Sequence, residues 1–304
     1  MKLVKLSNVK IPHIEDNIEP YASRPIPKQG IPLHHLGAVI GGTGSGKSTK
    51  ALEFLSWYDK AGSFDRLIIF SPTGMKDPKV KRFIEDKHNF KVTFYPKYDD
   101  KIMREEVASF ESDIEEWKLY IKRKLAYEKW VKNEDVDVLT LEELEYLNEI
   151  DFTKPKWLYP KEYFPCFAIL IDDHACCKNV FGANCKGFLS ELCVAHRHYS
   201  CSIYVLSQIF KSFIPRQFRG GIITLWLLFS TKSQKHKEDI AEQVANKVSE
   251  DTFLSVWDFA VKDSNHDCLV VDYKAQNIDT MFRRNFDKLI RLGDNIQLLE
   301  SKSI

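Results

Sequence analysis

Short apolar runs alternate with longer stretches of mixed apolar and polar residues along most of the chain. The runs have the length and β-branched content of buried strands and span 36–40, 66–72, 91–95, 167–171, 202–208, 222–229 and 268–272. Apolar residues at helical spacing predict helices at 47–58, 78–87, 235–248 and 250–260, and we expect a terminal basic helix around 282–286. This alternation predicts an α/β fold with a mainly parallel central sheet flanked by helices.

Residues 100–150 have a different pattern. Their apolar side chains recur three or four residues apart among many charges, at Val107, Phe110, Ile114, Trp117, Ile121 and Leu125. This predicts one long amphipathic helix, and Thr140 with Glu143 forms the capped start of a second. We interpret 100–150 as a helical insertion into a core made of 36–99 and 151–304. The helices either cover a sheet face or act as a lever or subunit contact.

The first 35 residues contain five prolines, which favour extended chain over helix. We expect an arm with one strand at 2–6. Such an arm either packs along the domain, reaches a neighbouring subunit or remains a flexible tail.

Composition limits the possible classes of function. The 304 residues are 44% hydrophobic and 29% charged, which is typical of a globular protein. The formal net charge of +1 means that any contact with DNA or RNA must come from a local patch. The 7 cysteines and a charged start without an apolar leader predict reduced thiols and an intracellular protein. The most apolar run, 222–229, is far shorter than the roughly 20 residues that a membrane span needs.

The strand predicted at 36–40 leads into a phosphate-binding pattern. Gly41, Gly46, Lys47 and Ser48 fit G-x-x-x-x-G-K-[ST], the P-loop or Walker A motif. Glycines let backbone N–H groups surround phosphates, the lysine contacts the β- and γ-phosphates, and the serine hydroxyl binds Mg²⁺. The alternative is a glycine-rich turn without a ligand. The predicted nucleotide-binding residues are Gly41, Gly42, Thr43, Gly44, Ser45, Gly46, Lys47, Ser48 and Thr49.

The strand predicted at 167–171 ends in two carboxylates, Asp172 and Asp173, as in a Walker B motif. Parallel strands deliver such side chains to the ligand-binding edge of a sheet. We expect Asp172 to hold Mg²⁺ through water and Asp173 to orient or deprotonate the attacking water.

The next predicted strand ends at Gln208, whose amide is then placed to sense the γ-phosphate or position water. An ordinary strand-end glutamine is the alternative. Pro215, Arg216 and Arg219 follow in a predicted loop, and an arginine there is a candidate to complete a neighbouring subunit's site.

Cysteines and histidines cluster after the Walker B pattern, at Cys176, Cys177, Cys185, Cys193, His196 and His198. Their spacing matches no standard zinc motif. Buried apolar thiols are the favoured interpretation, with a zinc site as the alternative.

Taken together, these motifs resemble those of the viral genome-packaging ATPases of the FtsK/HerA superfamily, within their poxvirus-like branch. The resemblance covers about 36–275 and rests on the P-loop, Asp172-Asp173, the stretch 195–199, Ser207-Gln208 and 215–219. It implies a RecA-like core, a homo-oligomeric ring of five or six subunits, and ATP and Mg²⁺ as cofactors. It also implies movement of double-stranded DNA into a preformed capsid with capsid or portal components, in a host-cell virus factory or virion.

The resemblance carries over residue by residue. Lys47 and Ser48 match Walker A, Asp172 and Asp173 match Walker B, and Gln208 matches the sensor. The candidates for an arginine acting in trans are Arg197 and Arg219. Two features depart from the family: most members have Glu where this chain has Asp173, and helices as long as those at 100–150 exceed the minimal core.

Two other classes of function stay open. One is another ring-type nucleic-acid ATPase or helicase, and the other is a P-loop kinase or nucleotide-regulated assembly protein. A glutamine after the strand that follows Walker B, and no evident arginine-rich lid, favour the translocase. Its candidate DNA contacts are Lys211, Arg216, Arg219 and 232–237.

Overall fold

The computed structural model describes residues 24–172, 180–182, 185–211 and 213–292. Its strands are β1 (Leu36–Ile40), β2 (Arg66–Phe70), β3 (Lys91–Tyr95), β4 (Phe167–Ile171), β5 (Cys201–Ser207), β6 (Leu225–Phe229), β7 (Cys268–Asp272), β8 (Phe282–Arg284) and β9 (Lys288–Leu289). Its helices are α1 (Lys47–Ala61), the 3₁₀ helix η2 (Gly74–Lys76), α2 (Pro78–Glu85), α3 (Asp100–Asn133), α4 (Leu141–Asn148), α5 (Phe188–Ala195), α6 (Arg216–Arg219), α7 (Gln234–Val244), α8 (Glu250–Val261) and α9 (Ile278–Met281).

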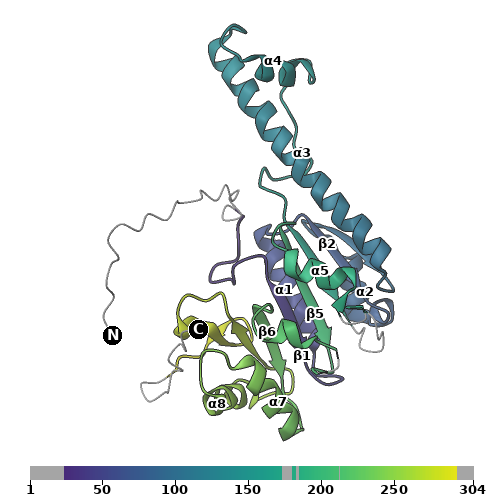
Figure 1. Cartoon of the computed structure of the whole chain (residues 1–304), viewed down its shortest axis with the longest axis vertical. Helices are drawn as coiled ribbons and strands as arrows, with labels where there is room; N and C mark the ends of the chain where they lie inside the picture. Colours follow the sequence, from purple (N-terminus) through teal and green to yellow (C-terminus); the bar gives the residue numbers. More distant parts are fainter. Residues whose placement is uncertain (1–23, 173–179, 183–184, 212, 293–304) are drawn as a thin grey trace, which may run out of the picture.

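All nine strands join one sheet in the order β3-β2-β4-β5-β1-β6-β7-β8-β9 (Figure 1). In this order, every pair of neighbouring strands between β3 and β6 is parallel. Strands β7, β8 and β9 then extend the sheet with antiparallel pairing. The predicted fold class, a mainly parallel sheet flanked by helices, is therefore confirmed. The P-loop strand β1 lies in the centre, separated from the Walker B strand β4 only by β5.

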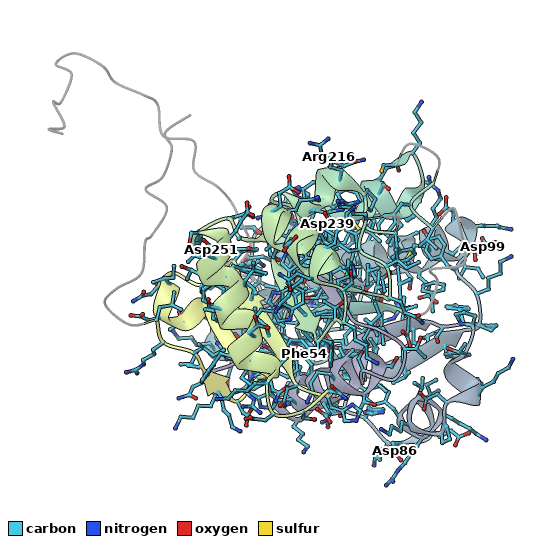
Figure 2. The ribbon with its side chains drawn as sticks, turned by 90° about the horizontal axis from the view of Figure 1, so that it is seen from below. Phe54, Asp86, Asp99, Arg216, Asp239 and Asp251 are labelled. Atoms are coloured by element: carbon cyan, nitrogen blue, oxygen red, sulfur yellow. The ribbon has the colours of Figure 1, made fainter. Side chains whose placement is uncertain are left out.

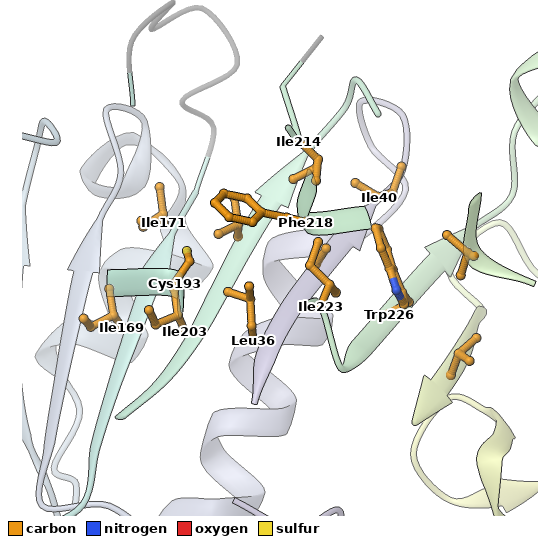
Figure 3. Packing of buried hydrophobic residues seen from close by; sticks show 14 of the residues in the cluster. Leu36, Ile40, Ile169, Ile171, Cys193, Ile203, Ile214, Phe218, Ile223 and Trp226 are labelled. Carbon is orange, nitrogen blue, oxygen red and sulfur yellow. The ribbon is translucent and has the colours of Figure 1, made fainter. Parts of the chain in front are cut away.

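Side chains that alternate along the strands form a core on each face of the sheet. In β2, Leu67 and Ile69 belong to the core that contains residues of α1 and α2, while Ile68 and Phe70 belong to the core on the other face, which contains residues of α3, α5, α7 and α8. Figure 3 shows part of the second core, where Ile169 and Ile203 of neighbouring strands lie near Cys193 of α5. Burial on both faces explains why these strands are continuous apolar runs in the sequence.

Helix α3 is about 51 Å long at 1.5 Å per residue and extends well beyond the body of the molecule (Figure 1). Its first half covers the sheet, where Phe110 stacks on Phe167 with ring centroids 4.0 Å apart. Its second half leaves the body, and Leu125, at the end of the predicted apolar stripe, is 60% exposed. Both helices predicted in 100–150 are present.

The outer half of α3 is supported by α4. Helix α4 starts at the predicted capping box of Thr140 and Glu143. Ion pairs Lys129–Glu143 and Arg123–Glu149 join it to α3 at 2.6 and 2.7 Å. A second helix therefore supports the projecting part of α3 between Arg123 and Lys129.

An ion-pair network fixes α3 to the body. The Arg66 guanidinium, at the start of β2, contacts Glu106 at 2.6 Å and Asp113 at 3.2 Å. The Asp113 carboxylate also accepts a hydrogen bond from the Tyr159 hydroxyl at 2.5 Å. Because Glu106 and Asp113 lie two helical turns apart, this one arginine fixes both the position and the direction of α3.

The described end of the N-terminal arm packs against the body. Arg24 forms a buried ion pair with Asp65 at 2.6 Å, and Ile31 is fully buried beside Tyr58. The strand predicted at 2–6 lies outside the described residues.

The prediction of a helix at 282–286 was wrong, because 282–284 form strand β8, which pairs antiparallel with β7. Phe282 is fully buried, while the Arg284 guanidinium binds Asp263 and, at 2.6 Å, Asp267. A two-arginine stretch resembles the charged end of a helix, but ion pairs with the preceding loop let it form a strand here.

Candidate nucleotide-binding site

The P-loop connects the end of β1 to the first turn of α1. The backbone N–H of Gly41 donates to the Ser207 carbonyl at 3.2 Å, which aligns the start of the loop with the end of β5. A Cβ atom at Gly41 would lie 2.6 Å from Ser45 Oγ, and Gly46 has a left-handed φ of 94°. These two positions therefore need glycine for space and for backbone conformation respectively.

Residues of the predicted Walker A and Walker B motifs meet at the carboxyl edge of the sheet. The Ser48 hydroxyl donates a hydrogen bond to Asp172 Oδ2 at 2.9 Å, although the residues are 124 positions apart. Asp172 follows β4 and is only 5% exposed. A hydroxyl and a carboxylate side by side are the hard oxygen donors that Mg²⁺ prefers, so these residues fit a magnesium ion.

Gln208 emerges between the P-loop strand and the Walker B strand, directly after β5. Its Oε1 accepts a hydrogen bond from the Thr43 hydroxyl at 2.9 Å. The predicted sensor therefore contacts the P-loop itself, through exposed side chains that an incoming ligand can displace.

Lys47 lies at the start of α1, as the motif requires. Its ammonium donates to the Gly42 carbonyl at 2.9 Å, so the side chain folds back over the loop. It is partly exposed, which leaves its charge accessible from the solvent side of the loop.

Two cavities flank the loop. The first, of about 500 Å³, is lined by Gly44, Gly46, Lys47, Ser48, Thr49, Lys50, Glu53, Asp77, Lys79 and His266. The second, of about 530 Å³, lies on the β6 side and includes Gln208, Thr231, His236, Trp257 and Asn265. The P-loop thus separates two open spaces, together large enough for an extended anionic ligand.

Several lining residues were not predicted from the sequence. His266, in the loop before β7, places Nδ1 3.2 Å from the Ser45 carbonyl, and Lys79 at the start of α2 contacts Thr49. No motif marks either residue. The one available signal was general: Lys79 lies shortly after the carboxyl end of a parallel strand, where ligand-binding loops gather.

The predicted catalytic base, Asp173, lies outside the described residues, as do Cys176 and Cys177. Of the predicted cysteine and histidine cluster, Cys193 is fully surrounded, and burial raises its thiol pKa. Among the residues that the structure describes, no group of three or more His, Cys, Asp or Glu side chains is arranged to hold a metal ion.

The two candidate trans arginines have different environments. Arg219, in α6, is 6% exposed and stacks 4.8 Å from the Phe210 ring centroid. Its guanidinium donates to the carbonyls of Ile214 (2.7 Å) and Lys211 and to Gln243 Oε1 (2.8 Å).

Arg197 is exposed, in the turn between α5 and β5. This turn lies at the amino edge of the sheet, opposite the P-loop. Among the described residues, neither arginine forms a hydrogen bond or ion pair with the P-loop of its own chain.

Buried basic residues gather near Arg197 at that amino edge. The Lys274 ammonium donates to the carbonyls of Leu33 and His34 at 2.8 and 2.5 Å, and His196 Nε2 lies 3.2 Å from the His34 carbonyl. Burial lowers the pKa of His34 to about 4 and of His196 to about 3. Burial and the Arg197 charge lower the pKa of Lys274 to about 8.

Comparison with known proteins gives similarity in structure only. No protein-family model matches the chain, and no curated protein sequence does. Within the described residues, no helix is both long and apolar enough to cross a membrane.

Three solved structures illustrate the similarity. The DNA-packaging ATPase B204 from Sulfolobus turreted icosahedral virus is 13% identical with a TM-score of 0.48, over 83% of this chain and 96% of that one. The genome packaging NTPase B204 from Sulfolobus turreted icosahedral virus 2, with ATP-gammaS, is 12% identical with a TM-score of 0.43, over 84% and 98%. EssC (ATPases 2 and 3) from Geobacillus thermodenitrificans is 11% identical with a TM-score of 0.45, over 86% and 40%.

Proposed function

We propose that this chain is an ATP-hydrolysing DNA translocase that packages viral double-stranded DNA into a preformed capsid. The main support is the Ser48–Asp172 hydrogen bond, because it joins a complete P-loop to a Walker B carboxylate at one sheet edge. The sequence resemblance to packaging ATPases of the FtsK/HerA superfamily supports the DNA-moving part of the proposal.

In this proposal ATP binds with its phosphates in the P-loop. Lys47 neutralises charge on the β- and γ-phosphates, while Ser48 and Asp172 hold Mg²⁺, which supplies further neutralisation of the transferring group. Asp173 orients or deprotonates the attacking water. Gln208 contacts the γ-phosphate and exchanges that contact for its hydrogen bond to Thr43 when the phosphate leaves.

The site is completed in trans by a neighbouring subunit of a homo-oligomeric ring. A trans arginine must be exposed and need not reach its own P-loop. Arg197 meets both conditions, whereas Arg219 is held by hydrogen bonds in its own chain. We therefore favour Arg197 as the residue that stabilises charge on a neighbour's γ-phosphate.

Contact with DNA would use exposed basic residues of α6 and of the β6–α7 region. Lys211 pairs with Asp239 at 2.6 Å, and Lys237 pairs with Asp258, so both charges are already compensated. Arg216 points outward from the surface in Figure 2, and Lys232 and Lys235 are exposed as well. These three residues are the stronger candidates for binding backbone phosphates.

The test is the ATPase rate with and without linear double-stranded DNA, at low and at physiological salt. We expect stimulation by duplex that weakens as salt rises, because phosphate contacts release counterions. Replacing Arg216 and Lys235 together by Ala should reduce stimulation while leaving the basal rate unchanged, because neither residue lines a cavity beside the P-loop. Hydrolysis indifferent to duplex, or phosphate transfer to a small acceptor, would contradict the proposal.

A further inference from the structure

A second lysine from outside the P-loop reaches the same cavity. Lys79 lies in the first turn of α2, and its ammonium donates to the Thr49 hydroxyl at 3.3 Å. Both residues line the cavity of about 500 Å³ that the P-loop opens into. Thr49 directly follows the Walker A serine, so the lysine is brought next to the phosphate-binding motif from 30 residues away.

The backbone around Lys79 is firmly placed. Helix α2 begins with Pro78, and the Asp77 side chain caps it by accepting a hydrogen bond from the Lys79 N–H at 2.8 Å. The apolar side of the helix is anchored by Val80 and Phe83, which are buried in the core beneath α1. The side chain is thus free to respond to a ligand while its attachment point stays fixed.

The hydrogen bond also orients the Thr49 hydroxyl. A threonine hydroxyl has one proton to donate and two lone pairs that accept. Because Thr49 Oγ1 accepts from Lys79, its own proton remains available for a phosphate oxygen in the cavity. Lys79 therefore supplies a positive charge and also orients the neutral Thr49 hydroxyl so that it can donate a hydrogen bond.

The other cations in the cavity have different partners. Lys50 forms an ion pair with Glu53 at 2.7 Å, which compensates its charge. Lys47 belongs to the P-loop and acts on the β- and γ-phosphates. Among the described residues, no carboxylate lies within 4.0 Å of the Lys79 ammonium, so its charge is available to a bound anion.

We infer that Lys79 and Thr49 together bind the α-phosphate of the nucleotide, the phosphate that Lys47 does not reach. This inference rests on the proposed function in that it takes a nucleoside triphosphate as the ligand of the P-loop. It adds a phosphate contact made by α2, a helix outside both Walker motifs. Nucleotide binding thereby engages the Lys79 side chain while helix α2 itself stays in place.

Calorimetric titration of AMP, ADP and ATP into the full chain, with Mg²⁺ present, tests this assignment. We expect Lys79→Ala to lower the affinity for all three nucleotides by a similar factor, about fivefold to tenfold, since each contains the α-phosphate. Lys47→Ala should lower the affinity for ADP and ATP far more than the affinity for AMP. Lys79→Arg should restore most of the affinity, because it keeps the charge.

Lys81→Ala is the matched control. It removes an exposed lysine of the same helix, paired with Glu85 at 3.8 Å and absent from the cavity lining, and should bind like the wild type. Unchanged affinity for AMP in Lys79→Ala, or a loss that grows with the number of phosphates, would overturn the α-phosphate assignment alone. A wild-type chain that binds none of the three nucleotides would overturn both this assignment and the proposed function.

Discussion

Basic and polar side chains lie at both edges of the central sheet, but they differ in how accessible they are to solvent. At the carboxyl edge, Lys47, Thr43 and Gln208 remain accessible and contact each other or the loop backbone. At the amino edge, His34 and His196 are 8% and 4% exposed and are covered by their surroundings. At the proposed nucleotide-binding edge, a ligand can replace the existing interactions, whereas the two histidines at the amino edge are enclosed by the protein.

The largest expected effect is the loss of ATP turnover when a P-loop residue at the carboxyl edge is replaced. Lys47→Ala should lower ATP turnover at least about a hundredfold, because one preorganised charge at the transferring phosphate is lost. Lys60→Ala is the control, since it removes an exposed lysine from the other end of α1. Turnover is measured by phosphate release, and persistent activity in pure Lys47→Ala protein would sink the P-loop assignment.

Strand-end carboxylates allow a matched comparison of the two edges. Asp172 follows β4 at the carboxyl edge, while Asp272 ends the antiparallel β7 opposite Leu225, at the amino edge. Asp172→Asn should reduce magnesium-dependent turnover roughly tenfold to a hundredfold, because the amide lacks the charge that Mg²⁺ prefers.

Asp272→Asn should instead leave turnover unchanged and alter only the unfolding midpoint. Phosphate release and thermal unfolding are measured on both variants. Equal losses of turnover in Asp172→Asn and Asp272→Asn would contradict the proposal that the carboxyl edge, and not the amino edge, binds the nucleotide.

The two arginines show that exposure, and not the edge alone, decides which basic side chain a ligand can reach, because Arg197 is exposed at the amino edge whereas Arg219 is buried. Arg219→Ala should lower the free energy of unfolding by about 2 kcal/mol, because it leaves the buried carbonyl of Ile214 and the partly buried carbonyl of Lys211 without their donor. Arg197→Ala should keep wild-type stability but lose turnover, and mixing it with Lys47→Ala subunits should restore part of the rate if sites are shared. Urea unfolding and phosphate release measure both, and full turnover by Arg197→Ala would remove it as the trans residue.

The smallest expected effect concerns pH at the amino edge. The pKa values of His34 and His196 are about 4 and about 3 in the folded chain, below the unfolded value near 6.5. The unfolded chain therefore binds more protons across this window, and stability falls as pH drops from about 6.5 towards 4. Each histidine should account for about 2 kcal/mol lost by pH 5.

His196→Gln provides the check on that loss. Urea unfolding at pH 7.5 and pH 5.0 should show a smaller pH-dependent difference for the variant, by about 2 kcal/mol. An identical difference in both proteins would place the acid sensitivity elsewhere.

Much of the core could be predicted because strands buried on both faces are continuous apolar runs. The run 167–171 matches β4 residue for residue, and the helix expected from Lys47 begins there. Boundaries were less certain where apolar residues continue into loops, as before β6, which starts at Leu225 rather than residue 222. Strand β8 was missed because long-range ion pairs with Asp263 and Asp267 are not a local signal.

The site was predictable where a motif fixes the chemistry, and less so where tertiary contact does. Ser48, Asp172 and Gln208 could be named as candidates because each follows a recognisable strand or loop. Lys79 and His266 were not, since only the packing of α2 and of the loop before β7 brings them to the P-loop. Spacing along a chain carries no information about such neighbours.

Displacement of a triplex-forming oligonucleotide from linear duplex DNA most directly tests whether hydrolysis at the carboxyl edge moves the protein along DNA. We expect displacement by the wild-type chain with ATP and Mg²⁺. We expect none with Lys47→Ala, and none with a non-hydrolysable analogue. Duplex-stimulated ATP hydrolysis without displacement, or displacement by Lys47→Ala, would contradict the proposed translocation.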